Sequence, residues 1–295
     1  MKLKGCFVAS VTPFDEQGQV NEEALRNHVD FLVAGGVAGV VPCGTTGESA
    51  TLSWEEHNRV VDIAIEQAKG KAVIIAGAGS NNTAESINAA RHAQQKGADA
   101  ILCITPYYNK PTQEGLFRHY QSIATKVDIP IVVYNVPGRT GVNLMPETVE
   151  RLCSFDNIVA IKEASGNVGQ VSEIHRRCGD RLTILSGDDG LTLPLMAVGA
   201  QGVISVVANI VPRKMSDLVE AAVKREFSRA LQLHEELLPL CDSMFFETNP
   251  IPVKTAMNLL GMNGGTLRLP LVFMQEHNKA RLIAVLKSYN FTIRE

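Results

Sequence analysis

Short runs of β-branched and other apolar residues recur along the chain at intervals of about one strand plus one helix. Between these runs, polar and apolar residues alternate with the period of an amphipathic helix. The strand-like runs are almost continuously apolar, which is typical of parallel strands covered by helices. We therefore predict eight parallel strands. They begin near residues 5, 39, 72, 100, 130, 158, 182 and 202.

Several intervening segments carry helix start and stop signals. Asn21 precedes a helical pattern, Ser53 and Glu56 form a capping-box motif before another, and Gly97 follows a third. Strict strand and helix alternation leaves a closed barrel or an open doubly wound sheet. No G-x-G-x-x-G or Walker loop follows a strand, and the count of eight favours a (β/α)8 TIM barrel.

The barrel is predicted to occupy residues 1–225, and residues 226–295 to form a C-terminal helical extension packed on it. Helical patterns in the extension lie near 228–240, 254–261 and 278–289. No linker-like or low-complexity tract separates the two parts.

Composition narrows the classes of partner. The net charge is −3 and the pI is about 6.2, with acidic and basic residues interspersed, so no basic stripe is available for nucleic acid or lipid. Six scattered cysteines favour reduced thiols in a cytoplasmic protein. The uncharged stretch 190–212 is interrupted by Pro194 and Gly199, which favours a buried helix and strand over a membrane span.

Lys162 is the unusual residue of the sixth predicted strand. Strand side chains alternate, so Val159 and Ile161 are expected to face the outer helices, while Ala160, Lys162 and Ala164 face the barrel interior. A buried ammonium is costly, and a lowered pKa would provide the neutral amine that imine chemistry requires. The alternative is a structural lysine that reaches solvent or pairs with Glu163 or an aspartate.

Active sites of such barrels lie at the carboxyl ends of the strands, where this chain has further polar groups. The loop GTTGES at 44–49 suits a carboxylate or phosphate, although a glycine-rich turn would look the same. Arg139 follows the fifth strand and could bind a carboxylate, or it could be an ordinary surface arginine. Tyr134 either packs in the core or offers its hydroxyl to the site.

Asp188 and Asp189 follow the seventh strand without a histidine or glutamate at metal-ligand spacing. A helix N-cap is the favoured role for these two residues. We accordingly expect no metal and no cofactor.

Together these motifs resemble the dihydrodipicolinate synthase and N-acetylneuraminate lyase superfamily of class I aldolase-type barrels. The resemblance spans essentially the whole chain and follows a fixed order of motifs. They are VTPF at 11–14, GTTGE at 44–48, YNVPGRT at 134–140, the strand with Lys162, NPIPVK at 249–254 and TLRLP at 266–270.

GTTGE and the arginine of YNVPGRT favour the members that condense pyruvate with L-aspartate 4-semialdehyde in diaminopimelate and lysine biosynthesis. The resemblance implies Lys162 as the Schiff-base residue, Tyr134 as the proton relay, and Thr46 and Tyr108 as its hydrogen-bonded companions. It also implies substrate-binding roles for Thr45, Thr46, Arg139, Gly187 and Ile204. The alternatives are an N-acetylneuraminate lyase or sugar-acid aldolase of the superfamily, or a barrel that binds a metabolite without turnover.

The same resemblance implies a homotetramer, a dimer of dimers, in which Tyr108 reaches into a neighbouring subunit's site. It further implies feedback inhibition by L-lysine. Trp54 stands where lysine-sensitive enterobacterial members have histidine. The residues that match the inhibitor site are Ser49, Ala50, His57, Asn81, Glu85 and Tyr107.

Overall fold

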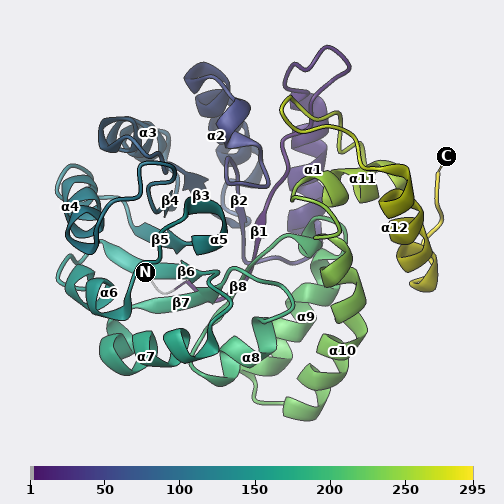
Figure 1. The fold of residues 1–295 in the computed structure, drawn as a ribbon. Coiled ribbons are helices and arrows are strands. Elements are labelled where there is room, and N and C mark those ends of the chain that lie inside the picture. The colour runs from purple at the N-terminus through teal and green to yellow at the C-terminus, as the bar shows by residue number, and fades with distance from the viewer. Residues whose placement is uncertain (1–2, 295) are drawn as a thin grey trace.

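A computed structural model describes residues 3–294, whose eight parallel strands close into a barrel (Figure 1). Each strand pairs with the next, and the last pairs with the first, so the (β/α)8 barrel is confirmed. The predicted strand starts are correct to within one residue. The strands are β1 (Gly5–Ala9), β2 (Gly39–Val41), β3 (Val73–Gly77), β4 (Ala100–Ile104), β5 (Ile131–Asn135), β6 (Ile158–Glu163), β7 (Thr183–Ser186) and β8 (Gly202–Ser205).

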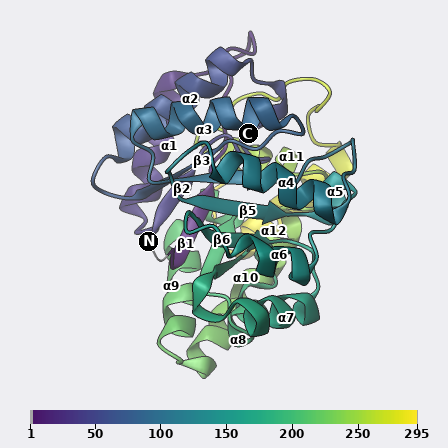
Figure 2. The same cartoon turned by 90° about the vertical axis from the view of Figure 1, so that its left-hand side faces the viewer.

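Helices cover the outside of the barrel, as the turned view shows (Figure 2). Among the expected caps, the Asn21 side chain accepts from the Ala24 amide, and Ser53 and Glu56 form the reciprocal capping box. The α-helices are α1 (Glu22–Ala34), α2 (Trp54–Ala68), α3 (Thr83–Lys96), α4 (Gln113–Ala124), α5 (Pro137–Thr140), α6 (Pro146–Leu152), α7 (Val168–Cys178), α8 (Thr192–Ala197), α9 (Pro212–Val223), α10 (Phe227–Ser243), α11 (Ile251–Leu259) and α12 (Glu276–Ser288). The short 3-10 helices are η1 (Ser49–Thr51), η2 (Gly179–Arg181) and η3 (Val207–Asn209).

Alternating strand residues form two apolar layers. One fills the barrel interior with side chains such as Phe7, Leu185 and Ile204, and the other lies between the strands and the helices. Most of the sixth strand follows the expected alternation, because Ala160 belongs to the interior layer and Ile161 to the outer one.

Val159 is an exception to the expected alternation of β6. It packs against the interior layer, whereas Ile158 belongs to the outer layer. The pairing of β5 with β6 shifts at this point, since Ile131 lies opposite Ile158 and Val132 lies opposite Ala160. The prediction that Val159 faces the helices is therefore wrong. An extra residue in the strand reverses the alternation before it.

The stretch 190–212 contains helix α8 and strand β8, as expected. Within residues 3–294 no helix has both the length and the apolar character needed to cross a membrane.

The predicted C-terminal helices are present as α10, α11 and α12 (Figure 1). Helix α10 packs against α9, and α12 packs against both α10 and α11. The chain between α11 and α12 returns to the loop that follows the first strand. The Thr266 amide donates to the Phe14 carbonyl at 3.0 Å, and Nε of Arg268 donates to the Gly18 carbonyl at 2.8 Å. The extension is thereby joined to the face of the barrel where an active site is expected.

Candidate active site

Lys162 lies inside the barrel on β6, with only 5% of its surface exposed. It pairs in register with Tyr134 on β5, and its Nζ lies 4.3 Å from the centre of the Tyr134 ring. Burial lowers the pKa of Lys162 to about 8, although the negative charge of Asp189 acts in the opposite direction. About one amine in ten is then neutral at pH 7, against about one in 2,500 at the ordinary pKa.

The carboxylates near Lys162 do not hold it in a salt bridge within residues 3–294. Glu163 lies on the opposite face of the strand, where it accepts from the Asn135 side chain at 3.0 Å and from the Ser165 amide at 2.8 Å. Asp189 is 3% exposed, and its Oδ2 accepts from the amides of Val206 and Val207. Lys162 is thus a buried amine whose chemistry is not blocked by an ion pair.

The expected N-cap role of the two aspartates is corrected by this arrangement. Helix α8 has Leu191 at its N-cap position, without a side-chain cap. Asp189 instead binds backbone amides that follow β8, and Oδ1 of Asp188 accepts from the Leu191 amide at 3.3 Å. The partners of Asp189 come from the segment after β8, and patterns that mark the start of a helix do not encode such a long-range contact.

Gly187 packs closely against the Lys162 side chain. A Cβ at this position would lie 2.6 Å from the Ala164 Cβ and 3.0 Å from the Lys162 Cε. A larger residue would therefore displace the Lys162 or Ala164 side chain. Ile204 is 1% exposed and belongs to the interior layer with Ala160 and Leu185.

Tyr134 has a threonine beside its hydroxyl, but it is Thr45 and not Thr46. Burial raises the pKa of Tyr134, while the Arg139 charge and a hydrogen bond with the Thr45 side chain act to lower it. Thr46 is 2% exposed, and its Oγ1 accepts from Nδ2 of Asn249 at 3.0 Å. Consecutive residues of this loop point in different directions, so the structure differs from the resemblance, which implied Thr46 as the companion of Tyr134.

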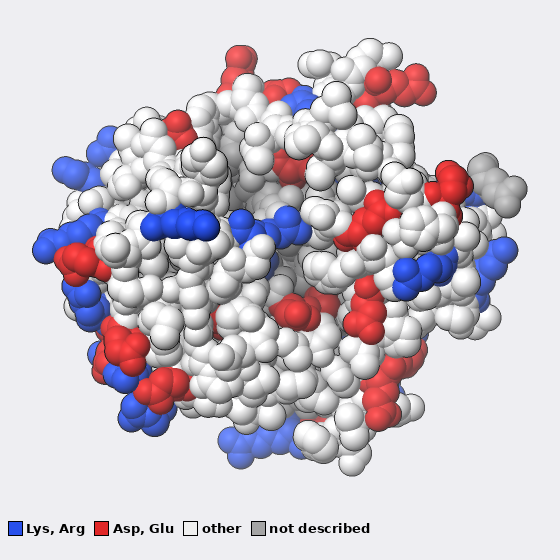
Figure 3. Space-filling model, viewed as in Figure 1, with Lys and Arg blue, Asp and Glu red and all other residues white. Residues whose placement is uncertain are grey.

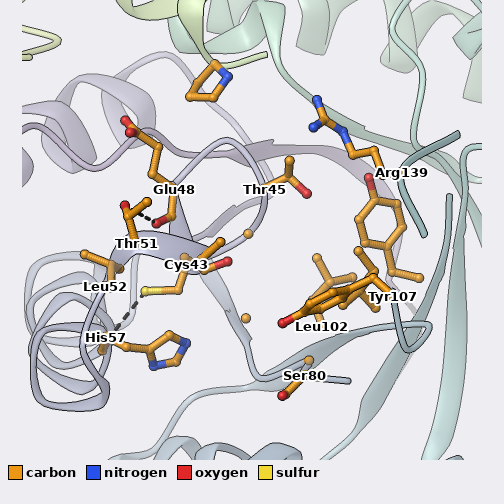
Figure 4. Close-up of a pocket in the computed structure, with 18 of the residues that line it drawn as sticks. Cys43, Thr45, Glu48, Thr51, Leu52, His57, Ser80, Leu102, Tyr107 and Arg139 are labelled. Carbon is orange, nitrogen blue, oxygen red and sulfur yellow. Dashed lines mark hydrogen bonds between the residues drawn. The ribbon is translucent and has the colours of Figure 1, made fainter. Parts of the chain in front are cut away.

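A pocket of about 490 Å³ opens in front of Tyr134 at the carboxyl ends of the strands. Its hollow is visible on the face shown in Figure 3. Figure 4 shows Arg139 on the side opposite Glu48 and Leu52, with Thr45 between them. Arg139 is exposed, and its guanidinium donates to the Asn249 carbonyl at 3.1 Å. A carboxylate entering this pocket would meet both a cation and hydroxyl donors.

The two consecutive tyrosines have different environments. Tyr107 lines the pocket, whereas Tyr108 is 90% exposed and has a positive φ of 71°. The chain's own fold therefore does not bring Tyr108 to Tyr134. A left-handed backbone at a tyrosine is uncommon, and here it accompanies a ring that lies in solvent.

The residues matched to the inhibitor site gather at the outer part of the same pocket. Oε2 of Glu85 accepts from the Ser80 hydroxyl at 2.7 Å, and Nδ2 of Asn81 donates to the Tyr107 carbonyl at 3.1 Å. Asn81 itself lies behind the lining. The matched residues that line the pocket are Ser49, Ala50, His57, Glu85 and Tyr107.

Sequence analysis did not identify two residues that contact the loops of the candidate site. Asn249 contacts both Thr46 and Arg139, and Lys254 forms a buried salt bridge of 2.7 Å with Glu48 of the GTTGES loop. Both residues lie in NPIPVK, which the resemblance had highlighted without a role for either of them. The described part of the chain contains no cluster of three or more His, Cys, Asp or Glu residues suited to a metal ion.

A family model and curated proteins match nearly the whole chain. The model of the dihydrodipicolinate synthetase family matches residues 2–289. A curated relative from Geotalea daltonii, named 4-hydroxy-tetrahydrodipicolinate synthase, is 54% identical over 97% of this chain and 99% of its own length.

Solved structures give the same result. Chloride-inhibited dihydrodipicolinate synthase from Acinetobacter baumannii, complexed with pyruvate, is 41% identical with a TM-score of 0.96, covering 98% of this chain and all of its own. The enzyme from Cyanidioschyzon merolae with lysine bound is 37% identical with a TM-score of 0.95, covering 97% of this chain and 98% of its own. From the family match and the relatives' identity over nearly the whole chain, we conclude that this chain belongs to the dihydrodipicolinate synthetase family.

Proposed function

We propose that this chain condenses pyruvate with L-aspartate 4-semialdehyde, as a 4-hydroxy-tetrahydrodipicolinate synthase, through a Schiff base on Lys162. The observation that carries this proposal is the buried, unpaired amine of Lys162, whose pKa is lowered to about 8. Tyr134, which pairs in register with Lys162, and Arg139 both line the pocket, and the absence of a side chain at Gly187 lets the Lys162 side chain lie close beside it. The names of the curated relatives support the same activity.

In the first step the neutral Lys162 amine attacks the ketone of pyruvate, and loss of water gives the imine. The pyruvate carboxylate is placed at the Thr45 and Thr46 loop. Loss of a methyl proton then gives an enamine. The high pKa of Tyr134 keeps its hydroxyl protonated near neutral pH, so it can pass protons with Thr45 as its partner.

In the second step the enamine carbon attacks the aldehyde of the semialdehyde, forming the new carbon–carbon bond. Arg139 is suited to hold the carboxylate of this substrate, because its guanidinium stands at the pocket wall. The substrate's own amine then attacks the imine carbon. It displaces the Lys162 amine and closes the ring, which regenerates the enzyme.

Tyr108 would complete the relay from a second copy of the chain within a homotetramer. Its ring is 90% exposed on a left-handed residue, a placement that suits insertion into a partner.

L-lysine is the proposed feedback inhibitor at the outer pocket. The Glu85 carboxylate is suited to the inhibitor's ammonium, and a structural neighbour is described with lysine bound. Trp54 also lines this region and packs edge-on against His57.

Borohydride trapping tests the proposal directly. Treatment with pyruvate and borohydride should reduce the imine to a stable secondary amine, and peptide mass spectrometry should locate the adduct on Lys162. Lys162→Ala should give no adduct and almost no turnover. Absence of an adduct on Lys162 in the unmodified chain would refute the Schiff-base mechanism.

A second measurement separates the synthase from a lyase of the superfamily. Turnover with pyruvate and L-aspartate 4-semialdehyde is compared with cleavage of N-acetylneuraminate under the same conditions. We expect only the condensation to be efficient, because Arg139 matches a short substrate with a carboxylate. Faster cleavage of N-acetylneuraminate would reject the proposed substrate.

A further inference from the structure

Asn249 occupies a buried position between helices α10 and α11, far in sequence from the barrel loops that it contacts. Only 5% of its surface is exposed. Its side-chain Nδ2 donates to Oγ1 of Thr46 at 3.0 Å, and its backbone carbonyl accepts from Arg139 at 3.1 Å. One residue of the C-terminal extension thus contacts groups at both proposed carboxylate-binding positions.

The hydrogen bond to Thr46 has a defined direction. An amide nitrogen can only donate, so the Thr46 oxygen must be the acceptor in this contact. The Thr46 hydroxyl has a single proton, which forms no other hydrogen bond within residues 3–294. That proton therefore remains available to a carboxylate in the site. Thr46 is only 2% exposed. If its hydroxyl donated to residue 249 instead, water could not replace the hydrogen bond lost by the carboxylate.

The Asn249 side chain has few hydrogen-bond partners other than Thr46. Its Oδ1 is buried and has no hydrogen-bond partner in the described part of the chain. The contact with Thr46 is therefore the one hydrogen bond that this side chain forms in that part of the chain. The contact to Arg139 is independent of the side chain, since it uses the backbone carbonyl.

We propose that Asn249 is a positioning residue that sets the Thr46 hydroxyl as a hydrogen-bond donor toward the pyruvate carboxylate. The inference rests on the proposed function, because it assumes that pyruvate binds at the Thr45 and Thr46 loop. Asn249 does not touch the reacting atoms. It acts on pyruvate binding through Thr46, and it anchors Arg139 through a carbonyl that any residue at position 249 would retain.

Asn249→Asp is the sharpest test, because it replaces the donor with an acceptor of the same shape. The Thr46 hydroxyl should then donate to the new carboxylate and turn its proton away from the substrate. We expect the KM for pyruvate to rise at least about tenfold. The KM for the semialdehyde should change less, because the Arg139 contact is preserved. Asn249→Ala should have a smaller effect on pyruvate, since the hydroxyl is released but not reversed.

A double-mutant cycle shows whether the effect passes through Thr46. In a Thr46→Val background, Asn249→Asp should produce almost no additional change in the pyruvate KM. Urea unfolding of each variant verifies that the fold is retained, and Asn249→Ala provides the measurement if the aspartate variant does not fold.

The outcomes separate this inference from the proposed function. If the unmodified chain forms no pyruvate adduct, the proposed function fails. If it forms the adduct but Asn249→Asp leaves the pyruvate KM unchanged, the positioning role is wrong. The role is also wrong if the Asn249→Asp effect persists in full without the Thr46 hydroxyl, because a general electrostatic effect on Lys162 would then explain it.

Discussion

The reactivity of Lys162 depends on a balance of burial and two nearby charges. Burial is the largest influence on its pKa and lowers it, Arg139 lowers it further, and Asp189 raises it. The pKa of the lysine is therefore adjusted by burial and by charges that follow two other strands, β5 and β7. The sequence of one strand could suggest a reactive amine, but not whether each neighbouring charge raises or lowers its pKa.

The pH dependence of catalysis tests this balance. The neutral amine is the reactive form, so kcat/KM for pyruvate should fall about tenfold per pH unit below the Lys162 pKa of about 8. Asp189→Asn removes a charge that stabilises the ammonium, so the Lys162 pKa should fall and the profile should move to lower pH. An unchanged profile in Asp189→Asn would show that the aspartate does not act on this amine.

Arg139→Ala should affect the two substrates unequally. Loss of the guanidinium should raise the KM for the semialdehyde at least about tenfold, the typical effect of removing a charged hydrogen bond, with a smaller change for pyruvate. The missing positive charge should also raise the pKa of Lys162 and move the pH profile to higher pH, opposite to Asp189→Asn. Arg139→Lys serves as the control that keeps the charge. Unaltered semialdehyde kinetics in Arg139→Ala would remove its assigned role.

At the scale of elements, most of the barrel could be predicted from sequence because each strand and helix carries its own local signal. The strand starts, the Asn21 cap and the Ser53–Glu56 capping box all follow from residues a few positions apart. The inward direction of Val159 could not be predicted, since it depends on a register shift against β5.

The candidate site likewise has residues that the sequence could identify and contacts that it could not. Lys162 was identifiable because a lysine is unusual on an apolar strand. The residues alone left core packing open for Tyr134, and only the resemblance gave it a role. The pairing of Tyr134 with Thr45, and of Thr46 with Asn249, arises from contacts between distant parts of the chain. No period or spacing encodes contacts across 203 residues.

A buried ion pair connects the loop that contains Thr45 and Thr46 to the C-terminal extension. Nζ of Lys254 lies 2.7 Å from Oε1 of Glu48, with both side chains 1% exposed, and it also donates to the Thr12 carbonyl at 3.0 Å. Glu48 has a left-handed backbone with φ of 52°. The extension therefore fixes a strained loop whose hydroxyls belong to the site.

Removing one partner of this pair should be costly, because it leaves the other charge buried and unpaired. Lys254→Met or Glu48→Gln should each reduce the free energy of unfolding by about 3–5 kcal/mol. The double variant should lose less than the sum of the two. Lys224→Met provides a control, since its pair with Glu220 is exposed and its loss should not measurably alter stability. Additive losses in the double variant would contradict the pairing. Urea unfolding provides these values.

At the scale of the whole molecule, a buried histidine connects helix α1 to the segments that follow β1 and β8, the two strands that close the barrel. Nε2 of His28 on α1 lies 2.8 Å from Oδ1 of Asn209 in η3, and Nδ2 of Asn209 donates to the Ala9 carbonyl at 2.9 Å. The Val11 amide donates to the same Oδ1 at 3.2 Å, so Nε2 of His28 must carry a proton to bind there. Segments next to the first and the last strand in sequence meet at this cluster.

This histidine should make the fold sensitive to acid. Burial lowers the pKa of His28 from 6.5 to about 4, so the folded state keeps it neutral while the unfolded state binds a proton as the pH falls below 6.5. Its folded pKa is the lower one, so stability is lost as pH falls from about 6.5 toward 4. The loss reaches about 2 kcal/mol at about pH 5.

His28→Gln isolates this contribution, because glutamine can still donate to Asn209 but does not titrate. Urea unfolding at about pH 7.5 and about pH 5 should show a loss on acidification that is smaller by about 2 kcal/mol in His28→Gln than in the unmodified chain. The pKa of His119 is also lowered to about 4 by burial, and burial raises the pKa values of Asp189 and Glu163. These groups titrate in both proteins, so they cancel in the comparison. Equal losses in the two proteins would mean that His28 is not held neutral in the folded barrel.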